Sequence, residues 1–185
     1  ERATEISSHE ARLVSADIPL KGLRHLILAM PRVIRKCPST SLTVIGKAPK
    51  KSKLNKLIDD LNLKDRIIFK SGMTEEEIVN IYHNSDIAVI PSLYEGFGFG
   101  AGEAMACGIP LISTDWGGLK QVIGDSAIKI KAGSVEEIEE GILKLFTEET
   151  TRKELSEKGR QRMEELFDWK IAAKAYIDLF EALIK

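Results

Sequence analysis

Apolar residues along this chain follow two spacings that alternate from one end to the other. Short runs of mostly apolar residues predict buried strands, at 11–16, 42–45, 67–69, 87–90, 110–113 and 127–130. Segments in which apolar residues recur every three or four positions predict helices, at 23–37, 51–61, 118–123, 134–146, 149–166 and 169–184, with two more beginning near residues 74 and 98. Strands that alternate with helices predict an α/β fold, a doubly wound, Rossmann-like parallel sheet with helices on both faces.

Two of the predicted helices begin with a capping-box pattern, a hydroxyl residue followed three positions later by glutamate. Thr74 and Glu77 form one such pair, and Ser134 and Glu137 form the other. In a capping box the hydroxyl accepts from the backbone N–H of the glutamate, and the glutamate accepts in return from the backbone N–H of the hydroxyl residue. Each pair therefore predicts where a helix starts.

Four glycines lie where the helix after the 87–90 strand should begin. They are Gly96, Gly98, Gly100 and Gly102. Each costs roughly 0.5–1 kcal/mol relative to alanine inside a helix, so a purely structural turn would use one or two of them. Bare backbone at a helix N-terminus lets a ligand approach free N–H groups, and the helix dipole there favours an anion such as phosphate.

Two carboxylates flank these glycines. Glu95 precedes the first glycine, and Glu103 follows the last one. Both can border one crevice above the carboxyl end of the strand, which is where ligands bind in open α/β sheets. A phosphate between two carboxylates indicates a ligand with hydroxyl groups on both sides of the phosphate. A nucleotide sugar, with a ribose at one end and a hexose at the other, has that shape.

Composition and charge narrow the class of protein. The chain has 185 residues, 43% hydrophobic and 30% charged, which suits one globular domain with its own core. Its net charge of −1 and the lack of a basic run predict no nucleic-acid partner. No apolar stretch reaches the roughly 20 residues of a membrane span. Cys37 and Cys107 show no disulfide or metal spacing, so we expect a reducing, cytoplasmic setting and no metal site.

The residues around the glycines resemble a known family. The segment PSLYEGFGFGAGEAMACGIPLIST, at 91–114, is similar to the donor-binding motif of retaining glycosyltransferases of the GT-B fold, the large family 4 group also called glycosyl transferases group 1. Further matches occur in the same order along nearly the whole chain, namely Lys21-Gly22, Val44-Ile45-Gly46-Lys47, Phe69-x-Ser71-Gly72 and Phe167-x-Trp169.

The resemblance implies a domain organisation. A GT-B enzyme has two doubly wound domains with the active site between them, and the similarity covers only the C-terminal half. Residues 1–185 are therefore expected to be the nucleotide-sugar-binding (donor) domain, with the N-terminal acceptor domain absent from this chain. The chain begins with Glu1 rather than Met, which favours a fragment. Its expected partners are a nucleotide-sugar donor and its own N-terminal domain, and membrane contact is expected only through the absent domain.

The resemblance also implies roles for single residues. Lys21 would contact the donor diphosphate and help to stabilise the leaving group, and Glu95 would meet hydroxyls of the donor sugar; these two are the expected catalytic residues. Glu103 would accept hydrogen bonds from the ribose. The remaining expected nucleotide-sugar contacts are Ser15, Gly46, Lys47, Ser71, Gly72, Met73, Gly96, Phe97, Gly98, Phe99 and Gly100. No cofactor is expected.

Two departures from the family pattern leave alternatives open. Many relatives carry an arginine where this chain has Ser15, and Leu-Pro where it has Phe99-Gly100. A hydroxyl donates a hydrogen bond but brings no charge, and replacing proline with glycine softens the loop. The first hypothesis is the donor domain of a retaining glycosyltransferase that moves a hexose to an unknown acceptor. The alternative is a non-catalytic nucleotide-binding or assembly module, and a third is an epimerase or phosphorylase of similar architecture.

Overall fold

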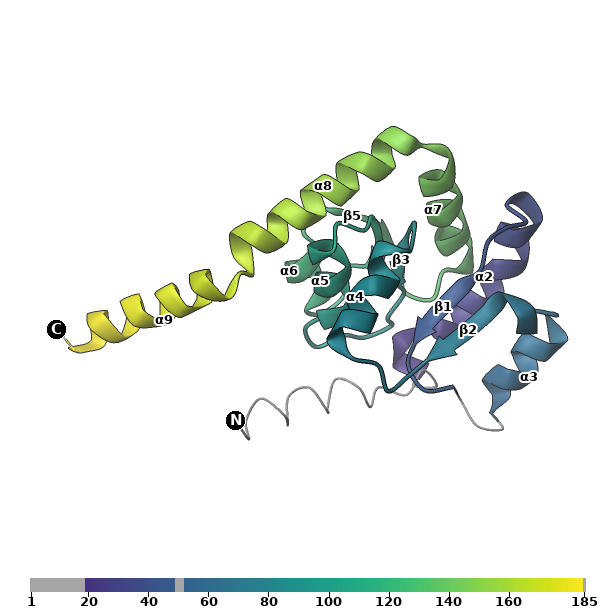
Figure 1. Cartoon of the computed structure of the whole chain (residues 1–185), viewed down its shortest axis with the longest axis horizontal. Helices are drawn as coiled ribbons and strands as arrows, with labels where there is room; N and C mark the ends of the chain where they lie inside the picture. The colour runs from purple at the N-terminus through teal and green to yellow at the C-terminus, as the bar shows by residue number, and fades with distance from the viewer. Residues whose placement is uncertain (1–18, 49–51, 185) are drawn as a thin grey trace.

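The computed structural model of the protein describes residues 19–48 and 52–184 (Figure 1). The strands are β1 (Leu42–Ile45), β2 (Ile67–Lys70), β3 (Ala88–Ile90), β4 (Leu111–Thr114) and β5 (Ala127–Ile130). The helices are η2 (Pro19–Lys21), α2 (Leu23–Lys36), α3 (Lys53–Asp60), η3 (Lys64–Arg66), α4 (Glu75–His83), α5 (Phe99–Ala106), α6 (Leu119–Ile123), α7 (Val135–Thr147), α8 (Glu149–Leu166) and α9 (Trp169–Ile184). The predicted elements from residue 23 onward are confirmed with small shifts at their ends. The predicted strand at 11–16 lies outside the described residues.

The strands are parallel and fall into two hydrogen-bonded groups. β1 pairs with β2, with Leu42 opposite Ile67, and β3, β4 and β5 pair in that order. Within residues 19–48 and 52–184, β1 and β3 do not pair with each other, so the sheet is divided at this point. Within each group the carboxyl ends of the strands lie at one edge, because the strands run in the same direction and helices return the chain.

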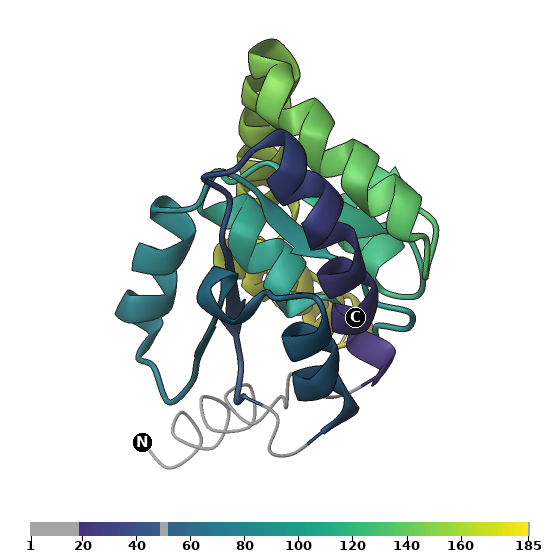
Figure 2. The same cartoon turned by 90° about the vertical axis from the view of Figure 1, so that its right-hand side faces the viewer.

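Helices cover both faces of the strands and enclose two apolar cores. On one face α2 packs beside α7, with α3 next to β1 and β2 (Figure 2). On the other face α5 and α6 pack against β3 and β4, with α8 behind them. In β4, Ile112 belongs to the first core and Leu111 to the second, and neither is exposed to solvent. A strand buried on both faces is what a doubly wound fold requires.

The two predicted capping boxes have different outcomes. At α4 the Thr74 hydroxyl accepts from Glu77 N, and the Glu77 carboxylate accepts from Thr74 N at 2.7 Å, so the complete box is confirmed. At α7 the Ser134 hydroxyl accepts from Glu137 N at 3.2 Å. The Glu137 carboxylate accepts instead from Lys131 N at 2.6 Å, so this box is only half formed and that prediction is wrong in its second half. The Glu137 carboxylate thereby ties the end of β5 to α7.

The last helix leaves the body of the domain. α9 extends away from the strands in Figure 1, and none of its residues is buried. Its apolar side chains include Trp169, 87% exposed, and Phe180, 59% exposed. The predicted apolar stripe on this helix therefore has no cover from the described residues. Across residues 19–48 and 52–184, no helix combines the length and the apolar character needed to cross a membrane.

We predict that Gly22→Ala destabilises the fold. Gly22 has a φ of +69°, a left-handed conformation that alanine adopts at a cost, and an added Cβ would overlap the Pro91 carbonyl oxygen. The free energy of unfolding, measured by urea denaturation, should fall by about 2 kcal/mol or more. Gly96→Ala is the matched control, because a Cβ at Gly96 would meet no other atom within 4 Å. Equal stability of the two variants would contradict the close contact of Gly22 with Pro91.

Candidate functional site

The site lies around the loop that joins β3 to α5. The loop begins at Pro91, and α5 begins at Phe99 with Gly98 as its N-cap residue. Gly98 has a φ of 102°, which a residue with a side chain rarely adopts, and a Cβ there would lie 2.7 Å from the Leu119 side chain. The predicted helix start near Gly98 is confirmed. Glycine is required at this position by the backbone and by α6, before any ligand is considered.

The other glycines of the segment serve different purposes. Gly96 is exposed and has open space around it, whereas a Cβ at Gly102 would lie 3.6 Å from Met163 of α8. Gly100 lies between these cases, with Ile90 at 3.5 Å from a Cβ placed there. Gly96 and Gly100 therefore leave backbone accessible, whereas Gly98 and Gly102 allow close packing of neighbouring helices.

Among the described residues, no acceptor lies within hydrogen-bond reach of several backbone N–H groups at the start of α5. The first backbone hydrogen bonds of the helix are donated by Ala101 and Gly102 to the Gly98 carbonyl oxygen, at 3.0 and 3.1 Å. No residue in 19–48 or 52–184 accepts from the N–H groups of the four residues 97–100. Such a cluster at a helix N-terminus has the partial positive charge that favours a bound anion.

Lys21 and Glu95 form an ion pair beside these amides. The Lys21 ammonium donates to Glu95 Oε2 at 2.6 Å, and the Ser92 hydroxyl lies 3.4 Å from the same oxygen. The side chains are 35% and 17% exposed, so the pair remains accessible from solvent. The two loops are tied together by Leu93 N, which donates to the Leu20 carbonyl oxygen at 2.7 Å. The structure thus brings together the two residues expected to be catalytic, although 74 positions separate them in sequence.

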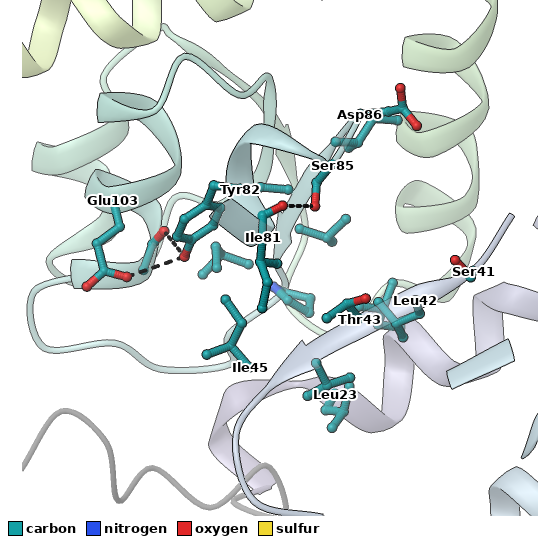
Figure 3. A pocket seen from close by; sticks show the side chains of 18 of the residues that line it. Leu23, Ser41, Leu42, Thr43, Ile45, Ile81, Tyr82, Ser85, Asp86 and Glu103 are labelled. Carbon is teal, nitrogen blue, oxygen red and sulfur yellow. Dashed lines mark hydrogen bonds between the residues drawn. The ribbon is translucent and has the colours of Figure 1, made fainter. Parts of the chain in front are cut away.

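Glu103 has a different partner, the phenol of Tyr82 in α4. The Tyr82 hydroxyl lies 3.3 Å from Glu103 Oε2 and 3.3 Å from the Gly100 carbonyl oxygen (Figure 3). Burial and the nearby Glu103 carboxylate raise the pKa of the phenol, so the hydroxyl keeps its proton and can donate. Partial loss of water raises the pKa of the Glu103 carboxyl, while the hydrogen bond from Tyr82 lowers it.

One cavity of about 860 Å³ receives most of these groups. Six of the predicted site residues line it, namely Lys21, Glu95, Gly98, Phe99, Gly100 and Glu103. Tyr82 and Ser92 line it as well, and sequence reasoning missed both as site residues. The ring of Tyr82 packs in an apolar core, and its hydroxyl is the signal that could have identified it. Ser92 is part of the glycine-loop motif, but the motif gave it no role of its own.

The remaining predicted site residues do not line the cavity, or they lie outside the described residues. Gly46 and Lys47 follow β1, and Ser71, Gly72 and Met73 follow β2; none of these five lines the cavity. Gly96 and Phe97 lie on the exposed part of the glycine loop, also off the cavity lining. The Phe97 ring packs 4.7 Å from the Phe99 ring. Ser15 lies outside the described residues.

Comparison with known proteins agrees with this geometry. The sequence profile of the family described as Glycosyl transferases group 1 matches residues 12–162. The chain belongs to this family. A curated relative, the MMP alpha-(1->4)-mannosyltransferase of Mycolicibacterium hassiacum, is 33% identical over 175 residues, which cover 93% of this chain and 42% of that protein. The glycogen synthase of Mycobacterium tuberculosis is 30% identical over 168 residues, 88% of this chain and 40% of that protein. The chain thus spans about two-fifths of the length of these curated relatives.

Solved structures of similar proteins share the fold. Sucrose-phosphate synthase from Thermosynechococcus elongatus superposes with a TM-score of 0.78 at 26% identity, covering 90% of this chain and 43% of that one. The C-terminal domain of a glycosyl transferase group 1 family protein from Francisella tularensis gives a TM-score of 0.73 at 26% identity, covering 82% of each chain. The predicted Rossmann-like fold, the C-terminal half of a GT-B fold, is confirmed.

We predict that Tyr82→Phe raises the pKa of the Glu103 carboxyl further. The substitution removes the hydrogen bond that lowers this pKa and leaves the desolvation that raises it. A carbon-13 NMR titration of the glutamate carboxyl groups would measure the change. Tyr176→Phe is the matched control, because Tyr176 is 65% exposed on α9, away from the cavity. A Glu103 titration that is the same in Tyr82→Phe and the unsubstituted chain would contradict the contact.

Proposed function

We propose that this chain is the donor domain of a retaining glycosyltransferase, which moves a hexose from a nucleotide-diphosphate sugar to an acceptor. The observation that carries the proposal is the joint placement of Lys21, the free amides at 97–100 and two carboxylates around one cavity. A diphosphate carries the charge that Lys21 and the amides favour, and the groups on either side of it carry the hydroxyls that carboxylates bind. The named relatives include a mannosyltransferase and a glycogen synthase, which transfer sugars.

Each residue has a distinct role in this proposal. Lys21 and the amides of Phe97–Gly100 hold the diphosphate and offset the negative charge that builds on it as the glycosidic bond breaks. Glu95 accepts from hydroxyls of the donor sugar and favours the positive charge that develops on its anomeric carbon. Glu103, oriented by the Tyr82 hydroxyl, accepts from the ribose. The leaving diphosphate acts as the base that receives the acceptor's proton. Because Lys21 and the amides offset the charge of the diphosphate, the proposed transfer needs no metal ion.

In this proposal the acceptor-binding site lies in a domain outside the 185 residues. The family relatives are more than twice as long as the segment they share with it. The exposed apolar face of α9, which includes Trp169, Phe180 and Leu183, offers a surface for the chain's own N-terminal domain. Free Cys37 and Cys107 are compatible with a reducing, cytoplasmic setting for the whole enzyme.

A second candidate is a nucleotide-binding module of the same fold that does not catalyse transfer. The observation in its favour is Phe99, which is 70% exposed beside the free amides at the point where many relatives carry Leu-Pro. A large, exposed aromatic ring there changes the shape of the sugar end of the cavity. Such a module would still bind a nucleoside diphosphate through Lys21 and Glu103, so binding alone does not distinguish the two candidates.

We predict that the 185-residue chain binds a nucleoside diphosphate sugar in the presence of EDTA. Isothermal titration calorimetry against UDP-, GDP- and ADP-sugars would identify the base, and Lys21→Met should weaken binding about tenfold or more because it removes a charged hydrogen-bond donor. Lys158→Met is the matched control, since Lys158 is exposed on α8 and does not line the cavity. A folded chain that binds none of these ligands at millimolar concentration would refute the proposed function.

We predict that Glu95→Gln separates binding from transfer in the full-length protein. Glutamine keeps the shape and one acceptor but loses the charge, so donor affinity should change only a few-fold while kcat falls at least about a hundredfold. Glu140→Gln, at an exposed position of α7, should keep full activity. Transfer that continues normally in Glu95→Gln would show that this carboxylate takes no part in the chemistry. A full-length protein that binds donor but transfers nothing would favour the module.

A further inference from the structure

Ser92 lies where three contacts to the backbone hold the start of the glycine loop. Its own carbonyl oxygen accepts from the Thr114 hydroxyl of β4 at 2.7 Å. The residue before it packs against Gly22, and the N–H of the residue after it donates to the Leu20 carbonyl oxygen at 2.7 Å. Ser92 itself is only 2% exposed. Its hydroxyl therefore has a position that β4 and the loop ending at Gly22 fix before any ligand binds.

The Ser92 hydroxyl is one of two donors that reach the same oxygen of Glu95. The hydroxyl lies 3.4 Å from Glu95 Oε2, and the Lys21 ammonium lies 2.6 Å from that oxygen. No other residue in 19–48 or 52–184 donates a hydrogen bond to this carboxylate. Both donors hold Oε2, so Oε1 is the oxygen that the described residues leave for another partner.

The two donors differ in mobility and in charge. The Lys21 side chain is 35% exposed and has a long flexible stem, so its ammonium can turn to an anion that enters the cavity. The Ser92 hydroxyl is short and buried, and it cannot follow. A hydroxyl also carries no charge. Ser92 can therefore orient the Glu95 carboxylate without neutralising it, whereas Lys21 does both.

We propose that Ser92 is a positioning residue that holds Glu95 when a bound diphosphate draws Lys21 away. Without a ligand, Lys21 is the stronger partner, because its hydrogen bond is shorter and charge-assisted. Once the ammonium turns to the diphosphate, the Ser92 hydroxyl remains as the donor at Oε2, and Oε1 is left for the sugar hydroxyls. This inference rests on the proposed function, in which Glu95 acts on the donor sugar.

A neutral anchor suits a carboxylate that has to stabilise positive charge. In the proposed transfer, positive charge develops on the anomeric carbon, and a cation that stayed on Glu95 would offset the negative charge that meets it. A carboxylate with no anchor would rotate freely, and a small displacement of a reacting group lowers the rate strongly. Ser92 supplies the orientation without the opposing charge, so its effect should fall on the rate of transfer rather than on donor binding.

A double-mutant cycle on the 185-residue chain tests the contact without any donor. The equilibrium constant of unfolding in urea would be measured for Ser92→Ala, Glu95→Ala and the double variant, both in the unsubstituted chain and in Lys21→Met. In Lys21→Met, where the hydroxyl is the one described donor left to Glu95, we expect the two residues to be coupled by at least about threefold. A coupling that is absent from Lys21→Met, or no larger there than in the unsubstituted chain, would overturn the inference.

Kinetics of the full-length protein test the role of Ser92 in transfer. Hydrolysis of UDP-glucose, GDP-mannose and ADP-glucose, in which water replaces the acceptor, would be followed by release of the nucleoside diphosphate. Ser92→Ala should lower kcat about tenfold while the KM for the donor changes less than about twofold. In Glu95→Gln the same substitution should lower kcat by less than a further factor of about two, because the residue that it positions has already lost its charge.

A matched control and the pattern of losses separate this inference from the proposed function. Ser126→Ala removes another buried hydroxyl, which donates to the Lys158 carbonyl oxygen at 3.3 Å outside the cavity lining, and it should leave kcat unchanged. If Glu95→Gln loses activity but Ser92→Ala does not, or if Ser92→Ala lowers kcat equally in both backgrounds, the inference is refuted and the proposed function stands. If Glu95→Gln keeps full kcat, the role proposed for Glu95 is refuted, and the inference with it.

Discussion

The contact between the loop at Lys21 and the loop at Glu95 is the constraint on which the rest of the site depends. Gly22 packs directly on Pro91, Leu93 N donates to the Leu20 carbonyl oxygen, and the ammonium and carboxylate meet at 2.6 Å. The backbone contacts bring the loops together, and the ion pair then forms at their junction. The loop at Glu95 follows β3, at the end of a strand where ligands bind in open α/β sheets, and the backbone amides at the start of α5 lie beside the junction.

The glycine loop depends in turn on a second backbone-to-backbone contact. A Cβ at Gly117 or Gly118 would overlap the carbonyl oxygen of Glu95 or Gly96, and Gly118 N donates to the Glu95 carbonyl oxygen at 3.0 Å. The loop before α6 therefore holds the loop before α5 in place through backbone packing and one backbone hydrogen bond. This support fixes Glu95 without using its side chain, which leaves the carboxylate available to Lys21 and to the cavity.

The sequence predicted the elements of the described part of the chain, but not the partners that arise from distant packing. Spacing identified α2 and α7 because their apolar stripes are long, and the capping box identified the start of α4. The motif pointed to Lys21 and Glu95, which the structure places in contact. The role of Gly102 could not be read, because Met163 reaches it from a helix about 60 positions later. The Glu137 carboxylate likewise accepts from Lys131 N instead of from the N-cap residue of its own helix. Tyr82 satisfied an apolar pattern with its ring, so the pattern concealed the contact made by its hydroxyl.

The two carboxylates of the cavity differ in how their charge is balanced, and this difference bears on how a donor would be handled. Glu95 is balanced by the ammonium of Lys21, whereas Glu103 is supported by the neutral phenol of Tyr82 in a partly desolvated position. If a donor binds as proposed, its anionic diphosphate would attract the Lys21 ammonium and weaken the ion pair with Glu95. The negative charge of Glu95 would then be less compensated when the sugar lies next to it. Phosphate binding would thereby prepare the carboxylate for a developing positive charge, while Glu103, without a cation to lose, keeps the same partner throughout.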